Sequence, residues 1–181
     1  MYKYWMLLSA IMFATSGTQE TSGDTIGGGP PAELKKIEFL LGEFRVRETY
    51  YVPDGSGQVL FSSDATVSCT ESLGGRYVSM AYKGRIPGIA GREALTLITY
   101  DPEAKKYRAW WFDSASQVVV QLQGAFRDSR LILYSEPMVV PDIGETRISF
   151  EKESEDRVIA LYEMKMGDRW VKQLEAVFTR K

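Results

Sequence analysis

The sequence predicts an all-β protein: an antiparallel up-and-down β-barrel of about ten strands, with one short N-terminal helix capping an end. Polar and apolar residues alternate along most of the chain after residue 42, which is the period of strands with one buried face. The links between these segments are short and rich in turn-forming residues, which favours antiparallel neighbours. So many strands tend to close into a barrel, because closure leaves no exposed edge. A two-sheet sandwich is the alternative.

The clearest strand signal is a hairpin within residues 95–114. Residues 95–100 alternate with a period of two, and residues 107–112 resume the pattern with aromatic side chains, which favour strands. Between them, Asp101 and Pro102 suit the first two positions of a type I turn. The predicted hairpin contains two of the four tryptophans.

The other strands follow the same reasoning, with turns or loops at 53–57, 73–76, 86–91, 127–129, 137–144, 153–156 and 167–168. We expect these strands at residues 43–52, 58–70, 77–83, 117–126, 130–136, 145–152, 157–166 and 169–179. The alternation places Cys69 on an apolar face, which indicates a small buried side chain more than a reactive thiol.

The predicted helix covers residues 31–41. Pro31 suits its first turn, Glu33 favours the N-terminal end of the helix dipole, and Gly42 stands where a C-terminal cap belongs. Its apolar residues share one face: Leu34, Ile37, Leu40 and Leu41. We expect this face to cover one end of the sheet.

The N-terminus has the features of a secretory signal peptide. Lys3 precedes an apolar run at residues 5–14, which is too short to span a membrane. Ala14, at the end of the run, and Ser16 are small residues at the two positions that a signal peptidase reads. The sequence therefore predicts a signal peptide at 1–16, a flexible Gly/Ser/Thr/Pro-rich linker at 17–31 and a barrel domain at 32–181. Export to the periplasm or the extracellular space follows. A buried N-terminal strand or helix is the alternative.

The amino-acid composition excludes several classes of functional site. The chain has no histidine, which excludes the usual Ser-His-Asp and Cys-His catalytic groups, His-ligated zinc and His-ligated haem. Its single cysteine cannot form an internal disulfide. A net charge of −2 without a basic block argues against nucleic-acid binding. We expect no cofactor, no metal and no membrane span in the mature chain.

Candidate ligand-binding residues lie mainly in the hairpin. Trp110 and Phe112 share one face of the strand, and Trp111 and Asp113 share the other, so one of these faces lines the barrel interior. An aromatic-lined pocket for an apolar ligand is the functional interpretation, and packing of the barrel wall is the structural one. Because Asp113 precedes a turn, we also expect it to cap backbone amides.

Four further residues complete the candidate set. Arg92 stands beside the loop at 86–91, where it would reach the mouth of the barrel. Gln173 and Glu175 lie among valines on the last strand, either as inward polar groups that orient a ligand or as part of a solvated face. Tyr100 flanks the hairpin turn opposite Tyr107 and could hydrogen-bond across it.

Several short segments together resemble the bacterial family known as domain of unknown function 1579, which is similar to the calycins, the lipocalins and fatty-acid-binding proteins. They are residues 41–44, 73–76, 97–101, 106–107, 111–114, Gly124 and 175–181. Phe44 departs from the family pattern, which usually has Trp there. The resemblance implies a lipocalin-like barrel and supplies no catalytic residue. The related nitrobindin type binds haem through a histidine, so that function does not transfer.

Three functions are consistent with these observations. The first is an exported barrel that binds a small, largely apolar molecule in its interior. The second is a structural or interaction module with a packed barrel. The third is a carboxylate-dependent enzyme, for example one that uses Asp113 with Glu175. The sequence leaves the ligand, the oligomeric state, the biological process and the inward face of each strand open.

Overall fold

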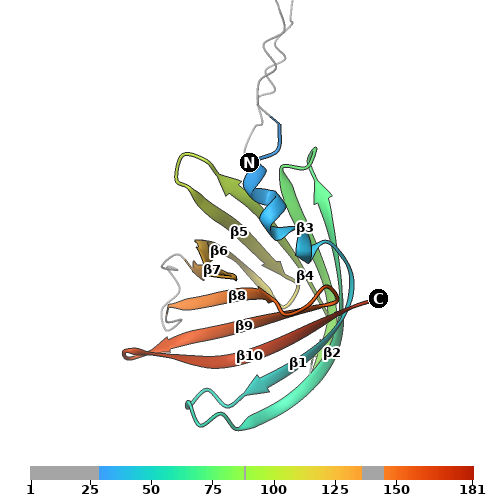
Figure 1. Cartoon of the computed structure of the whole chain (residues 1–181). Coiled ribbons are helices and arrows are strands. Elements are labelled where there is room, and N and C mark those ends of the chain that lie inside the picture. The colour runs from blue at the N-terminus through green and yellow to red at the C-terminus, as the bar shows by residue number, and fades with distance from the viewer. Residues whose placement is uncertain (1–28, 88, 136–144) are drawn as a thin grey trace, which may run out of the picture.

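The computed structural model describes residues 29–87, 89–135 and 145–181, and in them ten antiparallel strands close into a barrel. Each strand pairs with its neighbour in sequence, and the last strand pairs with the first (Figure 1). The predicted fold class is therefore confirmed, with one short helix near the N-terminus. Among the described residues, no helix has the length and apolar character needed to cross a membrane.

The elements agree closely with the sequence pattern. They are η1 Ala32–Leu40, β1 Gly42–Tyr51, β2 Val59–Ser72, β3 Tyr77–Ile86, β4 Ile89–Asp101, β5 Lys106–Asp113, β6 Ser116–Arg127, β7 Arg130–Ser135, β8 Thr146–Lys152, β9 Arg157–Met166 and β10 Arg169–Arg180. The loop predicted at 86–91 is wrong in its bounds: β3 continues to Ile86 and β4 begins at Ile89, because the backbone groups of these residues are paired in the ladder. The signal peptide predicted at 1–16, most of the linker and the connection at 137–144 lie outside the described residues.

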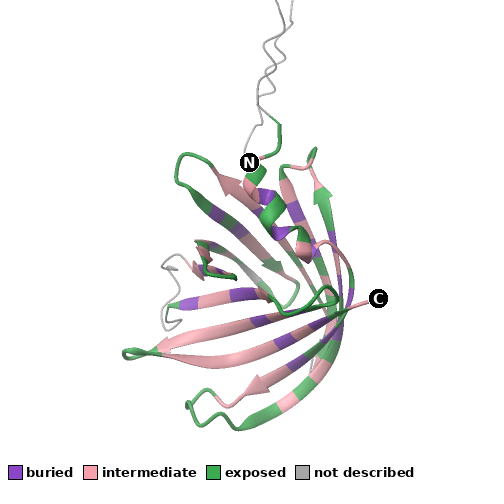
Figure 2. Cartoon of the chain, in the orientation of Figure 1, coloured by how far each residue is buried: buried purple, intermediate pink, exposed green. Residues whose placement is uncertain are grey.

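Burial follows the period of two along the strands (Figure 2). On β1, Phe44 and Val46 are buried whereas Arg45 and Arg47 are exposed. Cys69 on β2 is buried as expected, and burial raises the pKa of its thiol to about 12. The inward residues form one continuous core that extends from β1 around the barrel to β10.

The predicted helix is present and is of the 3₁₀ type. A 3₁₀ helix has three residues per turn, so side chains spaced by three lie in one row. Leu34, Ile37 and Leu40 have this spacing, and all three are buried in the core. The apolar spacing therefore fits a 3₁₀ helix better than an α-helix.

Gly42 is not the helix cap that the sequence suggested. Leu41 is the C-terminal cap in extended conformation, and Gly42 is the first residue of β1 with φ +123°. A Cβ atom at position 42 would collide with the guanidinium of Arg180. That guanidinium donates a hydrogen bond of 2.6 Å to the Leu41 carbonyl, so glycine makes room for the last strand to hold the end of the helix.

Hydrogen bonds and aromatic contacts fix η1 across one end of the barrel, which we call the closed end. The hydroxyl of Tyr107 on β5 donates to the Glu33 carbonyl at 2.7 Å. Phe44 and Phe178 pack edge to face with ring centroids 5.8 Å apart, and Arg180 lies 4.9 Å from the Phe44 ring centroid. The opposite end, where β1 and β5 finish, is the open end (Figure 1).

Removing the central side chain of the helix should destabilise the barrel. Ile37 is fully buried, so Ile37→Ala should lower the free energy of unfolding by about 2–5 kcal/mol through lost burial and a residual cavity. Urea denaturation followed by far-UV circular dichroism measures this change. Lys36→Ala, at an exposed position of the same helix, is the matched control. An equal effect of the two variants would contradict the conclusion that η1 stabilises the closed end by packing into the core.

Candidate ligand-binding site in the barrel interior

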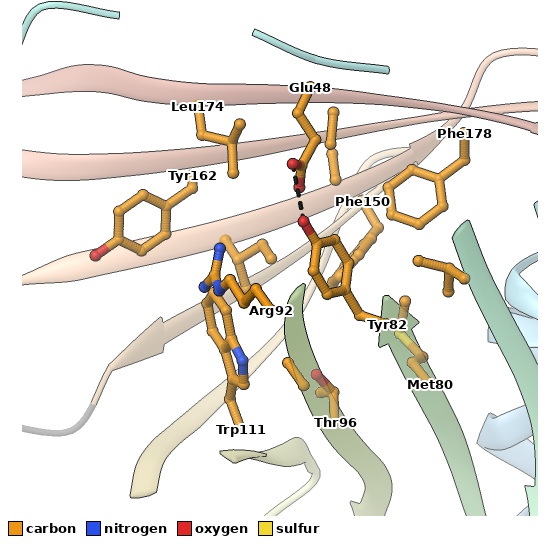
Figure 3. Close-up of a pocket in the computed structure, with 15 residues that line it drawn as sticks. Glu48, Met80, Tyr82, Arg92, Thr96, Trp111, Phe150, Tyr162, Leu174 and Phe178 are labelled. Carbon is orange, nitrogen blue, oxygen red and sulfur yellow. Dashed lines mark hydrogen bonds between the residues drawn. The ribbon is translucent and has the colours of Figure 1, made fainter. Parts of the chain in front are cut away.

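The barrel interior is not filled by side chains. An inner cavity of about 90 Å³ lies between the sheet walls (Figure 3). Most of its lining is apolar, including Ile148, Phe150 and Phe178. Glu48 and Arg92 are the charged residues among the side chains that line it. The cavity is therefore an apolar space with a small number of placed polar groups, as ligand sites usually are.

A second, wider chamber adjoins the inner cavity at the open end. Its volume is about 310 Å³, and its lining includes Tyr50 and Asp113, which stand near the open ends of β1 and β5. Four residues line both spaces: Arg92, Trp111, Tyr162 and Leu174. The two spaces together form a path from the open end into the barrel.

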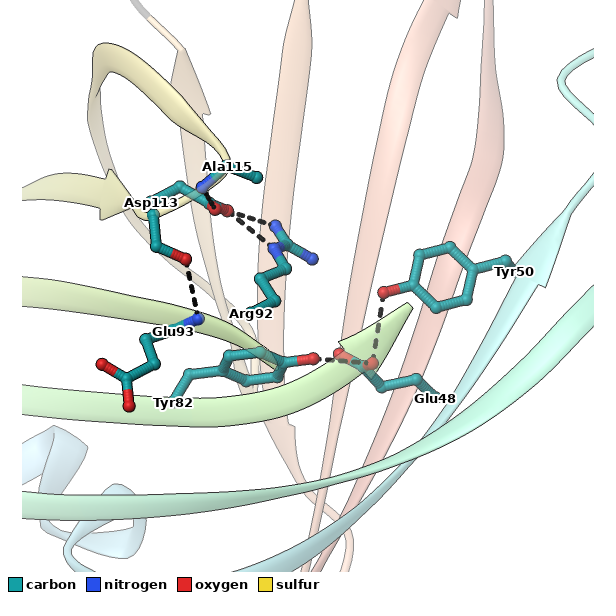
Figure 4. Close-up of polar contacts among 8 residues, drawn as sticks. Glu48, Tyr50, Tyr82, Arg92, Glu93, Asp113 and Ala115 are labelled. Carbon is teal, nitrogen blue, oxygen red and sulfur yellow. Dashed lines mark hydrogen bonds and ion pairs between the residues drawn. The ribbon is translucent and has the colours of Figure 1, made fainter. Parts of the chain in front are cut away.

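Glu48 is the principal polar group of the inner cavity. It lies on β1 on the same face as Phe44 and Val46, and only 4% of its surface is exposed. Three hydroxyl groups donate to its Oε2 atom: Ser63 at 2.8 Å, Tyr50 at 3.1 Å and Tyr82 at 2.9 Å. Figure 4 shows the two tyrosine bonds. Within the described parts of the chain, Oε1 accepts no hydrogen bond and Glu48 takes part in no ion pair.

The tyrosines that hold Glu48 are shifted from their usual acidity. Partial burial, followed by the nearby Glu48 carboxylate, raises the pKa of Tyr50 to about 12. The same two causes raise the pKa of Tyr82 further. Gly84 on β3 leaves the space that the Tyr82 side chain occupies, because a Cβ atom there would collide with the Tyr82 hydroxyl. Both phenols therefore remain proton donors to Glu48 well above neutral pH.

An ion pair between Arg92 and Asp113 lies at the open end. The Nε atom of Arg92 donates to Oδ2 of Asp113 at 2.8 Å, and Nη2 donates to the same oxygen (Figure 4). The other carboxylate oxygen accepts the backbone N–H of Ala115 at 2.9 Å, which confirms that Asp113 caps the β5–β6 turn. The side chains of the pair are only 14% and 13% exposed.

The environment of this pair favours its charged form. Burial alone would raise the pKa of Asp113, but the Arg92 and Ala115 hydrogen bonds outweigh it and the pKa is lowered. Burial alone would lower the pKa of Arg92, but its bonds to Asp113 raise it. The guanidinium also lies 5.6 Å from the Tyr82 ring centroid and 5.5 Å from the Trp111 ring centroid, so aromatic faces flank it.

The structure brings half of the residues predicted from sequence to the cavities. Those that line them are Arg92, Trp111, Asp113 and Gln173. Trp110 and Phe112 are on the outer face instead: Trp110 lies 6.5 Å from the Tyr77 ring, and Phe112 is 40% exposed. Tyr100 lies near the closed end and packs edge to face with Tyr107 at 5.1 Å. The Tyr107 hydroxyl bonds to η1, not across the hairpin to Tyr100.

Of the two residues predicted on the last strand, Gln173 lines the outer chamber and Glu175 does not, because of a bulge. The register of β10 against β9 shifts between Lys172 and Leu174, so these two residues do not share a face as strict alternation would require. Leu174 lines the cavities, whereas Glu175 is on the outer face and pairs with Lys172 at 2.9 Å. Asp113 and Glu175 therefore bind different cations and do not form a carboxylate pair.

The sequence reasoning missed Glu48 and the tyrosines that bind it. A signal for Glu48 was present: it occupies the position after Phe44 and Val46 in the apolar alternation of the first strand. A carboxylate at such a position is unusual, because buried carboxylates require partners. Tyr82 stands 34 residues further along the chain, and no short spacing connects the two.

Comparison with known proteins supports the fold. The family model described as "Protein of unknown function (DUF1579)" matches residues 30–180. A solved structure with a similar fold is the S-type phycobiliprotein lyase CPES from Guillardia theta, with a TM-score of 0.51 and 10% sequence identity, covering 84% of this chain and 98% of that chain. No curated protein matches the chain. At this identity the likeness shows the fold alone.

The raised pKa of Tyr50 predicts a loss of stability in alkali. The folded protein keeps this phenol proton longer than the unfolded chain, so the contribution is complete below about pH 10 and is lost toward about pH 12. Between these values, the wild-type protein should lose more unfolding free energy than Tyr50→Phe. Urea denaturation at a series of pH values compares the two slopes, and identical slopes would contradict the assignment.

Proposed function

The chain belongs to the DUF1579 family of proteins of unknown function, and from the geometry of its barrel we propose that it is a binding protein. It holds a small, largely apolar molecule in the barrel interior. The observation that carries this proposal is the inner cavity, which is mostly apolar and which continues into a wider chamber at the open end. Burial of apolar ligand surface there supplies the main driving force.

The arrangement of the two ends supports a holder with one entrance. The closed end is plugged by η1 and the Phe44–Phe178 pair. The open end leads past Arg92 and Trp111 into the cavity. The likeness of the barrel to that of a phycobiliprotein lyase also supports a role in handling a small molecule, although 10% identity carries over no reaction.

The alternative functions receive less support. An interaction module with a packed barrel requires a filled interior, whereas the described residues enclose a cavity. An enzyme that uses Asp113 with Glu175 requires two adjacent carboxylates, whereas these residues bind separate cations on opposite sides of the barrel wall. No metal or cofactor is part of the proposal; among the described residues, no cluster of three His, Cys, Asp or Glu side chains is suited to a metal ion.

We also propose that the protein is exported. The apolar run at 5–14 ends at Ala14, and this small residue together with Ser16 supports cleavage after Ser16. Expression of the full chain in a Gram-negative host should yield a periplasmic protein that begins at Gly17. Intact-mass and N-terminal peptide analysis of each cell fraction measures this. A cytoplasmic protein that retains Met1 would contradict export and leave the barrel proposal unaffected.

Filling the inner cavity should weaken ligand binding. N-phenyl-1-naphthylamine, a neutral probe that brightens in apolar surroundings, should bind the wild-type protein with saturation. Ala160 is buried and lines the inner cavity, so Ala160→Phe should weaken binding by about tenfold or more by occupying the same space.

Ala125→Phe is the matched control, because Ala125 is an exposed residue of β6. It should bind the probe as the wild-type protein does. Circular dichroism and thermal unfolding establish that both variants are folded. Equal binding by both variants, or no saturable binding by the wild-type protein, would contradict the proposed function.

A further inference from the structure

One carboxylate oxygen of Glu48 lacks a hydrogen-bond donor among the described residues, and this indicates which polar group the ligand carries. Its Oε2 atom accepts three hydroxyl donors, whereas Oε1 has no donor among the described residues. The side chain is 4% exposed and lines the inner cavity. A carboxylate oxygen that borders an apolar cavity is stabilised by a hydrogen-bond donor placed beside it. The space next to it is therefore suited to a group that donates a proton.

The charges around the cavity favour a cationic donor over an anion. Arg92 and Asp113 neutralise each other through two hydrogen bonds to one oxygen. Glu48 has no cation within 4.0 Å in the described parts of the chain, because none of the ion pairs there includes it. The lining charges therefore leave one uncompensated negative charge in an apolar cavity. A cation placed beside it would gain more than it would in water.

From these observations we propose that the ligand is an apolar molecule with a protonated amine at one end, which donates to Oε1 of Glu48. The inference rests on the proposed binding function and specifies its substrate class. The apolar body of the ligand lies along Trp111, Tyr162 and Leu174, which line both the inner cavity and the outer chamber. The three hydroxyl donors hold the carboxylate in position before the ligand arrives.

One feature of the cavity favours a ligand with a hydrogen-bond acceptor instead of an amine. The indole Nε1–H of Trp111 is buried and has no acceptor among the described residues, so it would suit a ligand oxygen. A neutral N–H that lacks a partner costs less free energy than a charged carboxylate without a cation. Glu48 therefore outweighs Trp111 in selecting the ligand, and a comparison of head groups tests this ranking.

The test is displacement of N-phenyl-1-naphthylamine by three molecules with the same octyl chain: octylamine, 1-octanol and octanoate, each at near-neutral pH and below its critical micelle concentration. Octylamine should displace the probe from the wild-type protein at a concentration about tenfold lower than octanoate does, because it gains a charge-assisted hydrogen bond. 1-Octanol should fall between them. This comparison needs no variant, so it stands even if a substitution at Glu48 prevents folding.

Glu48→Gln should remove the preference for octylamine and leave 1-octanol displacement almost unchanged. Asp64→Asn is the control, because Asp64 is an exposed carboxylate on the outer face that pairs with Arg47; it should keep the wild-type preference. Tighter binding of octanoate would overturn the inference in favour of an anion at Arg92, and equal binding of all three would overturn it while the binding function stands. Failure of the probe itself to bind would overturn both.

Discussion

The pairing of β1 with β10 is the constraint on which the rest of the structure depends. This pairing, which we call the seam, closes the sheet into a barrel with an inner and an outer face. A shift of its register by one residue would exchange the side chains of the two faces, so the register decides which side chains enter the interior. In the seam Glu48 stands opposite Ala176, and Phe44 and Val46 precede it on the same face. The carboxylate is thus brought into an apolar interior by the same alternation that buries the phenylalanine and the valine.

The two ends of the barrel differ: the closed end is packed with apolar side chains, and the open end is lined by polar groups around an accessible space. At the closed end, η1 supplies Leu34, Ile37 and Leu40, and carbonyls near its two ends accept hydrogen bonds from Tyr107 and Arg180. At the open end, polar groups bond to one another around a space that is still accessible. Glu48 lies between these regions, which explains how a buried charge can coexist with an apolar plug. Its hydroxyl donors lie on β1 toward the open end and on the two following strands, β2 and β3.

Much of the fold could be predicted from sequence, because each strand is a local pattern ended by a local turn. Asp101, for instance, accepts the backbone N–H groups of Glu103 and Ala104, which is the turn that its position before Pro102 indicated. The site was less predictable. Arg92, Trp111 and Asp113 were found because they lie at strand ends near recognisable turns. The cluster around Glu48 joins β1, β2 and β3 through the registers of two successive strand pairs, and the bulge in β10 depends on pairing with β9, so neither has a local signature.

The double role of Asp113 links the entrance of the barrel to the shape of its rim. One oxygen of this carboxylate holds the Arg92 guanidinium, and the other holds the backbone at Ala115. A ligand that displaced the Arg92 guanidinium would also disturb the carboxylate that holds the β5–β6 turn. The side chain at the entrance and the backbone of the rim are therefore held by a single residue.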